Sequence, residues 1–180
     1  MFTKRTVAFA LTILMLFTFA ACAGKKDGGD EAPLSDGKAI SFSTFDVNGA
    51  SVNSAELFAA NKVTMINVWA SWCGPCAREI PELQELSAEL DELGCGLVGI
   101  LIDGDTDTGL ATGRQIISAN GVTYVNLLPN DSINSQFPVQ YLPTTFFVDG
   151  NGMLIGDPIV GAQVDQYLPA VQRLLDELKG

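Results

Sequence analysis

The sequence contains no histidine, and this absence excludes several classes of catalytic and metal site. A Ser-His-Asp or Cys-His catalytic set uses an imidazole as its general base. A zinc site with histidine ligands and a haem held by a proximal histidine are excluded for the same reason. The chemistry of this chain must therefore rest on other side chains.

Positive charge is also scarce, because 10 lysines and arginines stand against 21 aspartates and glutamates, for a formal net charge of −11. Nucleic-acid binding needs a basic face that neutralises phosphates, so we expect no nucleic-acid partner. The 180 residues, 47% of them hydrophobic, suffice for one domain with a substantial core. The distinctive chemistry that remains is the sulfur of four cysteines.

The beginning of the chain has the pattern of a targeting segment. Lys4 and Arg5 precede an uncharged, mostly apolar run over residues 6–23. A basic start, an apolar stretch and small residues are typical of a secretory signal. The alternative is a permanent membrane-spanning helix, because the run approaches spanning length.

The end of this run offers two cleavage patterns. Residues 19–22, Phe-Ala-Ala-Cys, resemble the lipobox of bacterial lipoproteins, in which cleavage precedes a cysteine that becomes lipid-modified. This resemblance predicts a lipoprotein signal peptide over residues 1–21 and acylation of Cys22. Residues 21–23 also fit an ordinary signal-peptidase site, which would release the domain instead.

A polar segment follows the expected cleavage site. Residues 24–37 are mainly Gly, Lys, Asp, Glu, Pro and Ser, with little to bury. We interpret residues 22–37 as a flexible, lipid-anchored tether and residues 38–180 as the folded domain. The expected location is extracytoplasmic, anchored to the bacterial cell membrane, where disulfides persist.

Strand and helix patterns alternate through the folded part. Strands are expected at residues 40–47, 63–70, 96–102, 123–128, 144–149 and 153–160, and helices at 54–58 (capped by Ser54), 74–93, 108–120 and 163–179. Gly150-Asn151-Gly152 is a hairpin signature between the last two strands. This order predicts an α/β fold with a mixed sheet flanked by helices.

The sequence Trp72-Cys73-Gly74-Pro75-Cys76 lies where a buried strand meets the longest helix. Pro75 suits the first turn of a helix. At the helix start, Cys73 would face unpaired backbone N–H groups and the positive end of the helix dipole, which favours its thiolate. The spacing brings Cys76 within reach of Cys73, so a mixed disulfide at Cys73 can be resolved by Cys76.

An alternative interpretation of this pair is half of a four-cysteine zinc site. That site needs two further ligands, and the other cysteines are Cys22, assigned to lipid, and Cys95, which is isolated between two glycines. We therefore expect no metal, and we interpret Cys95 as a small buried residue rather than a third redox thiol.

An acidic stretch at residues 103–107 superficially suggests a calcium loop. Thr108 and Arg114 occupy the positions where such a loop needs Gly and Glu, so the template fails. We expect Asp103, Asp105 and Asp107 at a solvated helix entry.

The chain resembles the TlpA-like (ResA-like) family of membrane-tethered thiol-disulfide oxidoreductases. The resemblance covers residues 38–180 and rests on NVWASWCGPCAREIPEL at 67–83 and LPTTFFVDGNG at 142–152. It rests also on the helix and strand expected between residues 103 and 128, because this family carries an additional central αβ insertion. The resemblance implies a thioredoxin fold.

The resemblance also implies roles for individual residues. Cys73 would be the exposed nucleophile and Cys76 the resolving thiol. Pro143 would be a cis-proline that packs beside the cysteines and offers backbone to the substrate, whereas the sequence alone favours a trans peptide bond. The expected substrate-binding or structural positions at the site are Trp72, Gly74, Pro75, Leu142 and Pro143.

Proton transfer at the site needs a separate argument. Asn67 stands six residues before Cys73, where cytoplasmic thioredoxins carry a buried aspartate, and asparagine cannot titrate. A leucine stripe over residues 83–93, continued backwards, reaches Glu79 and then Cys76. A glutamate at this spacing is an active-site feature of the resembled family, and a buried carboxylate should have a raised pKa and could exchange protons with Cys76. The alternative is an ordinary acidic residue near a helix start.

These features predict an extracytoplasmic enzyme that reduces protein disulfides, with the Cys73/Cys76 dithiol and no further cofactor. Gly74-Pro75 adds no charge between the cysteines, so we expect a comparatively reducing site. The implied partners are disulfide-containing extracytoplasmic proteins and a membrane thiol carrier that donates electrons.

Three alternatives remain open. A disulfide-forming oxidase or isomerase would use the same residues. A thiol peroxidase would need Thr-x-x-Cys, and Ala70 stands three residues before Cys73. A tethered protein-binding module with a merely structural disulfide would need neither thiol.

Overall fold

The computed structural model describes residues 37–180. The signal expected at residues 1–21, the acylation site Cys22 and all but the last residue of the tether expected at 22–37 lie outside these described residues. Among the described residues, no helix has both the length and the apolar character needed to cross a membrane.

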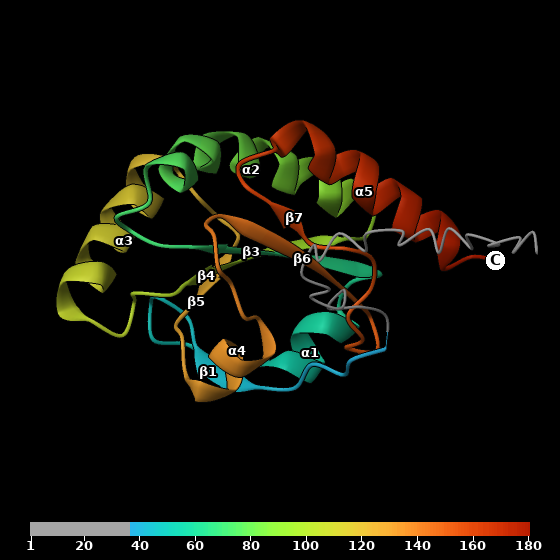
Figure 1. Cartoon of the computed structure of the whole chain (residues 1–180), viewed down its shortest axis with the longest axis horizontal. Helices are drawn as coiled ribbons and strands as arrows, with labels where there is room; N and C mark the ends of the chain where they lie inside the picture. The colour runs from blue at the N-terminus through green and yellow to red at the C-terminus, as the bar shows by residue number, and fades with distance from the viewer. Residues whose placement is uncertain (1–36) are drawn as a thin grey trace, which may run out of the picture. The chain divides into compact units, whose positions relative to one another are not determined.

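A five-stranded mixed sheet with strand order β5-β4-β3-β6-β7 forms the centre of the fold (Figure 1). The central strand β3 (Val63–Trp69) is buried along its whole length, as its apolar, β-branched sequence predicts. On one side β4 (Gly96–Leu101) and β5 (Val125–Leu127) run parallel to it. On the other side lie two antiparallel neighbours, β6 (Thr144–Asp149) and β7 (Ile159–Val160).

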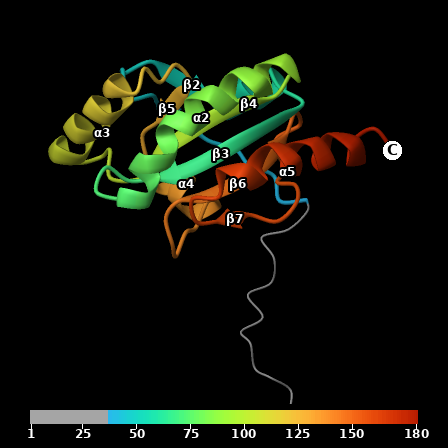
Figure 2. The same cartoon turned by 90° about the horizontal axis from the view of Figure 1, so that it is seen from above.

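Three helices lie on one face of this sheet. In Figure 2, α2 (Gly74–Glu92) and α5 (Val164–Glu177) lie over the sheet, and α3 (Asp107–Ala119) lies beside α2. The first of these connects β3 to β4, as a parallel pair requires. The helix and strand expected between residues 103 and 128 are α3 and β5, so this prediction is confirmed.

The opposite face is covered by shorter elements, which lie below the sheet in Figure 1. They are the hairpin β1 (Ser43–Phe45) and β2 (Ser51–Asn53), with α1 (Ser54–Ala59) and α4 (Asp131–Gln136). Their apolar side chains pack with residues of the central strands in one core cluster. The sheet is therefore enclosed between two layers.

Successive side chains of β3 point alternately into the two layers that enclose the sheet. Ile66 and Val68 belong to the core cluster beneath the sheet, whereas Met65 belongs to the cluster under α2 and α5. Because successive side chains of a strand point to opposite faces, Asn67 and Trp69 share the face of Met65. A polar residue of the central strand is thereby placed under the helix that begins with the two cysteines.

The last predicted strand is shorter than the sequence suggests. Only Ile159–Val160 pairs along β6, and Met153 and Leu154 make isolated bridges. Gly156 interrupts the strand with a φ of +62°, in the left-handed region, and Pro158 has no backbone N–H to donate. The strand expected over residues 153–160 is therefore wrong in its extent.

Two further expectations need correction. The cap of α1 is Asn53, whose side chain accepts from Ala55 N, while the Ser54 hydroxyl accepts from Phe42 N. The single strand expected over residues 40–47 is a three-residue strand that pairs in a hairpin with β2. The short helix α4 was not expected, because six mostly polar residues carry little apolar periodicity. The other predicted elements are confirmed, with ends that shift by two residues at most.

Candidate functional site

Cys73 and Cys76 are joined by a disulfide at the point where β3 ends and α2 begins, with Cα atoms 5.3 Å apart. Cys73 is the N-cap residue of α2, and its sulfur accepts a hydrogen bond from Cys76 N at 3.3 Å. Pro75 lies in the first turn, where a missing N–H costs nothing. The predicted junction of strand, cysteine pair and helix is confirmed.

The two cysteines differ in access to solvent. Cys76 is completely buried and Cys73 is 5% exposed, so the expectation of an exposed nucleophile needs correction. Both residues pack in a core cluster with Trp69 and Leu101, which explains the burial. Cys73 nevertheless lines a surface groove, and Cys76 does not. A partner that enters this groove reaches Cys73 first.

The groove has a volume of about 470 Å³ and lies between two segments of the chain. One wall comes from the cysteine motif and the other from the loop before β6. The lining residues are Trp72, Cys73, Gly74, Pro75, Ile102, Val139, Gln140, Tyr141 and Leu142. Trp72 and Tyr141, one from each wall, are 71% and 69% exposed. No acidic or basic side chain of the described residues lines the groove.

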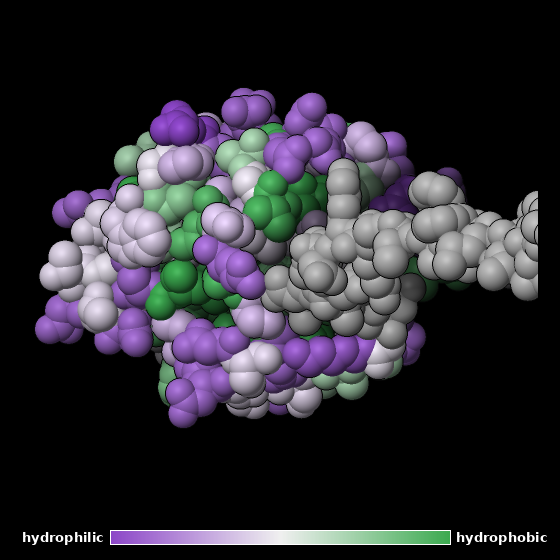
Figure 3. Space-filling view, viewed as in Figure 1, coloured by the Kyte–Doolittle hydropathy of each residue, from purple (hydrophilic) through white to green (hydrophobic). Residues whose placement is uncertain are grey.

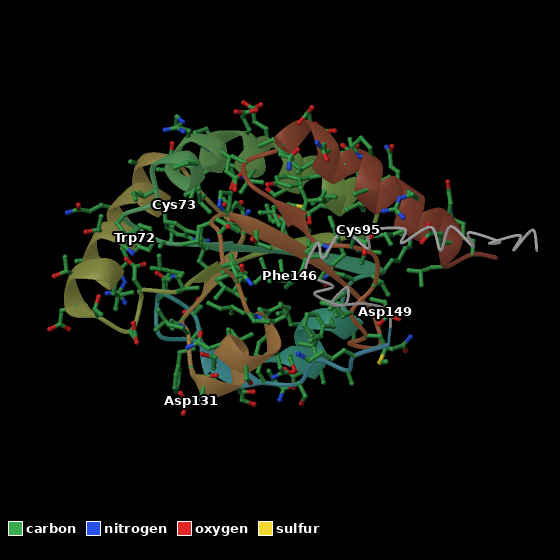
Figure 4. The ribbon with its side chains drawn as sticks, in the orientation of Figure 1. Trp72, Cys73, Cys95, Asp131, Phe146 and Asp149 are labelled. Atoms are coloured by element: carbon green, nitrogen blue, oxygen red, sulfur yellow. A yellow bond between two sulfur atoms is a disulfide. The ribbon has the colours of Figure 1, made fainter. Side chains whose placement is uncertain are left out.

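Hydrophobic surface occupies much of the left half of the face shown in Figure 3, with hydrophilic margins above and below. Figure 4, in the same orientation, places Trp72 and Cys73 in this half, at the end of β3 beside the start of α2. An exposed hydrophobic patch with polar margins is typical of a binding surface.

The Leu142–Pro143 peptide bond is cis, as the resemblance implied. Leu142 lines the groove and Pro143 is buried directly behind it, at the entrance to β6. The Pro143 carbonyl accepts from Gly161 N at 2.8 Å, and the Thr144 hydroxyl donates to the Tyr141 carbonyl at 2.8 Å. These two bonds fix the second wall of the groove to the sheet edge.

Glu79 lies on the buried face of α2 together with Cys76, which confirms the placement predicted from the leucine stripe. The residue is only 2% exposed, and both carboxylate oxygens are paired. Asn67 donates to Oε1 at 2.8 Å and Tyr167 donates to Oε2 at 3.0 Å. Burial raises the pKa of Glu79 to about 7, against the lowering effect of these two hydrogen bonds.

Sequence reasoning predicted the helix that carries Tyr167 but did not identify this residue as part of the site. It is completely buried in α5, and burial raises the pKa of its phenol to about 12. A buried phenol needs a hydrogen-bond partner, which is the signal that could have directed attention to it. Nothing local, however, links residue 167 to residue 79.

Asp103 also has a role that sequence reasoning missed. Its carboxylate accepts from both the backbone N–H and the hydroxyl of Ser71, directly before Trp72. The expectation that Asp103 lies at a merely solvated helix entry is therefore wrong, whereas Asp105 and Asp107 are exposed. Because Asp103 follows β4 and Ser71 follows β3, this contact ties together the ends of two neighbouring strands beneath the cysteine motif.

Cys95 is free and buried, at the end of α2 opposite the disulfide (Figure 4). The 19 residues of α2 span roughly 28 Å at 1.5 Å per residue. Cys95 cannot reach the Cys73–Cys76 pair, which supports its interpretation as a packing residue. Among residues 37–180, no group of three or more His, Cys, Asp or Glu residues could hold a metal ion.

Comparison with known proteins gives consistent matches. The profile of the AhpC/TSA family matches residues 35–156. The thiol-disulfide oxidoreductase ResA of Oceanobacillus iheyensis is 32% identical over 149 residues, which cover 79% of this chain and 73% of that protein. ResA of Bacillus thuringiensis is 26% identical over 92% of this chain and 94% of its own length. A solved thiol:disulfide interchange protein of the thioredoxin family from Chlorobium tepidum has a TM-score of 0.59 and 25% identity, over 72% of this chain and 90% of its own.

Proposed function

This chain belongs to the AhpC/TSA family, as a ResA-like thiol-disulfide oxidoreductase of the thioredoxin fold, and from this premise we propose that it reduces disulfides of polypeptides outside the cytoplasm. In the reduced enzyme, Cys73 attacks a substrate disulfide and one substrate thiolate leaves. Cys76 then attacks the Cys73 sulfur, the second substrate thiolate leaves, and the Cys73–Cys76 disulfide forms. Two electrons pass from the enzyme to the substrate.

The observation that carries this order of attack is the unequal access of the two sulfurs. Cys73 lines the groove, whereas Cys76 is completely buried behind it. A substrate sulfur that lies in the groove can meet only Cys73, so the mixed disulfide forms there. The buried Cys76 lies within disulfide distance of Cys73 and can complete the exchange without leaving the core.

The groove favours extended, uncharged substrate segments. Its walls are uncharged and mostly apolar or aromatic, with Gln140 among the lining residues and Trp72 and Tyr141 well exposed on the two sides. In an extended peptide, the backbone and the residues on either side of a cysteine are exposed. The cis Leu142–Pro143 segment gives that backbone a fixed segment to lie against. We therefore propose that disulfides in unfolded or exported polypeptides are the substrates.

Glu79 is proposed as the proton acceptor for the second step. The resolving thiol of Cys76 must lose its proton before it attacks, because the thiolate is the nucleophile. Glu79 lies on the same buried face of α2, and a pKa of about 7 makes its carboxylate an efficient base near neutral pH. The proton moves from the Cys76 sulfur to a Glu79 oxygen, and the thiolate then displaces the substrate.

The proposed direction follows from the weak stabilisation of the Cys73 thiolate. Within residues 37–180, this sulfur lies at the start of α2 and accepts from the N–H of Cys76, and no charged side chain lines the groove. A strongly oxidising pair needs a much stabilised thiolate. Because the residues that line the groove within 37–180 carry no charge that would stabilise its thiolate, we propose that Cys73 donates electrons rather than accepts them.

The reduction potential of the purified protein tests the direction. Equilibration in dithiothreitol and glutathione buffers, followed by tryptophan fluorescence and thiol-labelling mass, is expected to show one two-electron couple near about −220 to −280 mV. A couple near about −120 to −180 mV would instead favour an oxidase or isomerase. Without any two-electron couple, the binding-module alternative becomes the better explanation.

Anchoring through Cys22 and electron supply from a membrane thiol carrier complete the proposal. The support lies in the signal-like run over residues 6–23 and in the lipobox-like residues 19–22. Lipid on the first residue of the processed chain would hold the enzyme close to a membrane-embedded donor. Electrons would then flow from that donor through the Cys73–Cys76 pair to soluble substrates.

Substitution of Cys22 by alanine tests the anchor. In a bacterial host that processes lipoproteins, the unchanged chain is expected in the membrane fraction and labelled by radioactive palmitate. The Cys22→Ala chain is expected to lose the label and either leave the membrane or retain its uncleaved signal. An unchanged chain that is never labelled would contradict the proposed acylation and support the ordinary signal-peptidase site.

A further inference from the structure

The hydroxyl of Tyr167 lies between two acceptors that belong to different parts of the site. One is Glu79 Oε2 at 3.0 Å, on the helix that carries Cys76. The other is the Gly161 carbonyl at 3.2 Å, directly after β7. A phenol has a single hydrogen, so Tyr167 can donate to only one of them at a time.

The protonation state of Glu79 decides between these acceptors. When Glu79 is ionised, its carboxylate is the stronger acceptor and takes the phenol hydrogen. When Glu79 carries a proton on Oε2, that proton can be donated to the Tyr167 oxygen, and the phenol hydrogen is then free for the Gly161 carbonyl. Tyr167 therefore pairs with Glu79 in both states without moving.

The other partner of Glu79 cannot respond in this way. Asn67 donates one amide hydrogen to Glu79 Oε1 at 2.8 Å and also donates to the Thr145 hydroxyl at 3.1 Å. An amide nitrogen has no lone pair that could accept a proton from Glu79, so Asn67 favours only the state in which Oε1 is unprotonated. Of the two side chains within residues 37–180 that donate to this carboxylate, Tyr167 alone can act as donor and as acceptor.

We propose that Tyr167 is a positioning residue for the redox reaction. Its hydroxyl holds the Glu79 carboxylate on the buried face of α2 that carries Cys76, and it transfers its hydrogen bond to the Gly161 carbonyl when Glu79 takes up the proton of the resolving thiol. The inference rests on the proton-acceptor role proposed for Glu79. The Gly161 peptide also links Tyr167 to the second wall of the groove, because Gly161 N donates to the Pro143 carbonyl at 2.8 Å.

Several other titratable groups face Glu79. Glu82, on the same helix, raises its pKa through repulsion, and Cys76 shares its buried face. Tyr124, before β5, interacts electrostatically with Glu79, and no hydrogen bond between these two residues is recorded. Tyr124 is therefore a control for Tyr167, since it is a partly buried tyrosine that interacts electrostatically with the same carboxylate.

The test is the pH dependence of the resolving step. Reduced protein is mixed with a disulfide peptide, and the phase that requires Cys76 is followed from pH 5 to 9. In Tyr167→Phe the carboxylate loses a donor, so the apparent pKa of this phase is expected to rise by about one pH unit. Tyr124→Phe is expected to leave the apparent pKa unchanged.

The double variant separates this inference from the proposed role of Glu79. Glu79→Gln is expected to remove the rise of the resolving rate with pH, which we call the pH-dependent limb. Adding Tyr167→Phe to Glu79→Gln should then cause no further shift in the apparent pKa. If Glu79→Gln removes the limb but Tyr167→Phe leaves it in place, the positioning role alone is wrong. If the limb survives Glu79→Gln, the proton-acceptor role fails and this inference fails with it.

A second measurement applies even if Tyr167→Phe does not fold. The chain has three tyrosines, so in a Tyr124→Phe, Tyr141→Phe background 3-fluorotyrosine labels Tyr167 alone. Fluorine makes the phenol a stronger donor with little change in shape, so the apparent pKa is expected to fall, opposite to the Phe variant. A merely structural role predicts no movement, and that result would overturn the inference.

Discussion

Replacing Cys73 by serine is expected to abolish disulfide reduction, while replacing Cys76 by serine is expected to trap covalent adducts. Among residues 37–180, Cys73 is the only sulfur that lines the groove, so without it no mixed disulfide should form there, and the rate should fall on the order of a thousandfold or more. In Cys76→Ser the first attack still occurs, but nothing displaces the substrate. Insulin reduction and mass spectrometry of the adduct measure the two outcomes.

Cys95→Ala is the matched control for both variants. Cys95 is buried at the far end of α2 and has no path to the disulfide, so this substitution should leave the exchange rate unchanged. Adducts that form on Cys76 in Cys73→Ser would reverse the proposed roles. Full biological function in a chain without either thiol would favour the binding-module alternative.

The part of the site that sequence could predict is the part encoded locally. The run over residues 63–70 is apolar and β-branched, Pro75 suits a first turn, and the leucine stripe extends back to Glu79 and Cys76. Each of these signals lies in the strand or the helix that adjoins the cysteines. The structure accordingly confirms the strand, the helix and the burial of Glu79.

The parts that sequence could not predict depend on contacts between distant residues. The second wall of the groove comes from the loop around Tyr141, and the Glu79 partner Tyr167 lies 88 residues away along the chain. The resemblance supplied the cis bond before Pro143, which local sequence would have given as trans. The contact between Asp103 and Ser71 joins residues 32 positions apart, and an acidic stretch after a strand does not indicate which distant group it binds.

Gly99 shows the same limit in the core. The strand sequence GLVGIL predicts a buried strand, but it does not say why a glycine stands in its middle. A Cβ atom at residue 99 would lie 2.1 Å from Asn126 Oδ1, so only glycine leaves room for this side chain. The same Oδ1 accepts a hydrogen bond from Trp69 Nε1 at 2.9 Å. The glycine thus makes room for a polar contact between β5 and β3 that no local pattern indicates.

Replacing Glu79 by glutamine is expected to stabilise the oxidised protein at alkaline pH while it slows the reaction. In the folded chain burial raises the pKa of Glu79 from 4.5 to about 7. Between pH 4.5 and about pH 7, Glu79 is ionised in the unfolded chain but still protonated in the folded chain. The contribution of Glu79 to the free energy of unfolding therefore falls as pH rises through this range. This decrease in the free energy of unfolding is complete above about pH 7 and amounts to about 3 kcal/mol at most.

Glutamine resembles protonated glutamate and has no charge to bury, so Glu79→Gln should escape this loss. Its free energy of unfolding is expected to exceed that of the unchanged protein by about 2 kcal/mol at pH 8, and the difference should vanish below about pH 4.5. Urea unfolding at several pH values measures both. Glu85→Gln, an exposed change on the same helix, is the matched control and should show no such difference.

The same variant should be a poorer enzyme, and the two effects have one cause. A carboxylate that is costly to ionise in the core is a strong proton acceptor once ionised, and this is the property that the resolving step uses. Glu79→Gln is therefore expected to slow resolution at neutral pH by about a hundredfold, within the usual range for loss of a general base. A variant that gains no alkaline stability would contradict the raised pKa of Glu79. A variant that gains this stability but resolves mixed disulfides at the normal rate would show that Glu79 is a buried structural acid with no part in proton transfer.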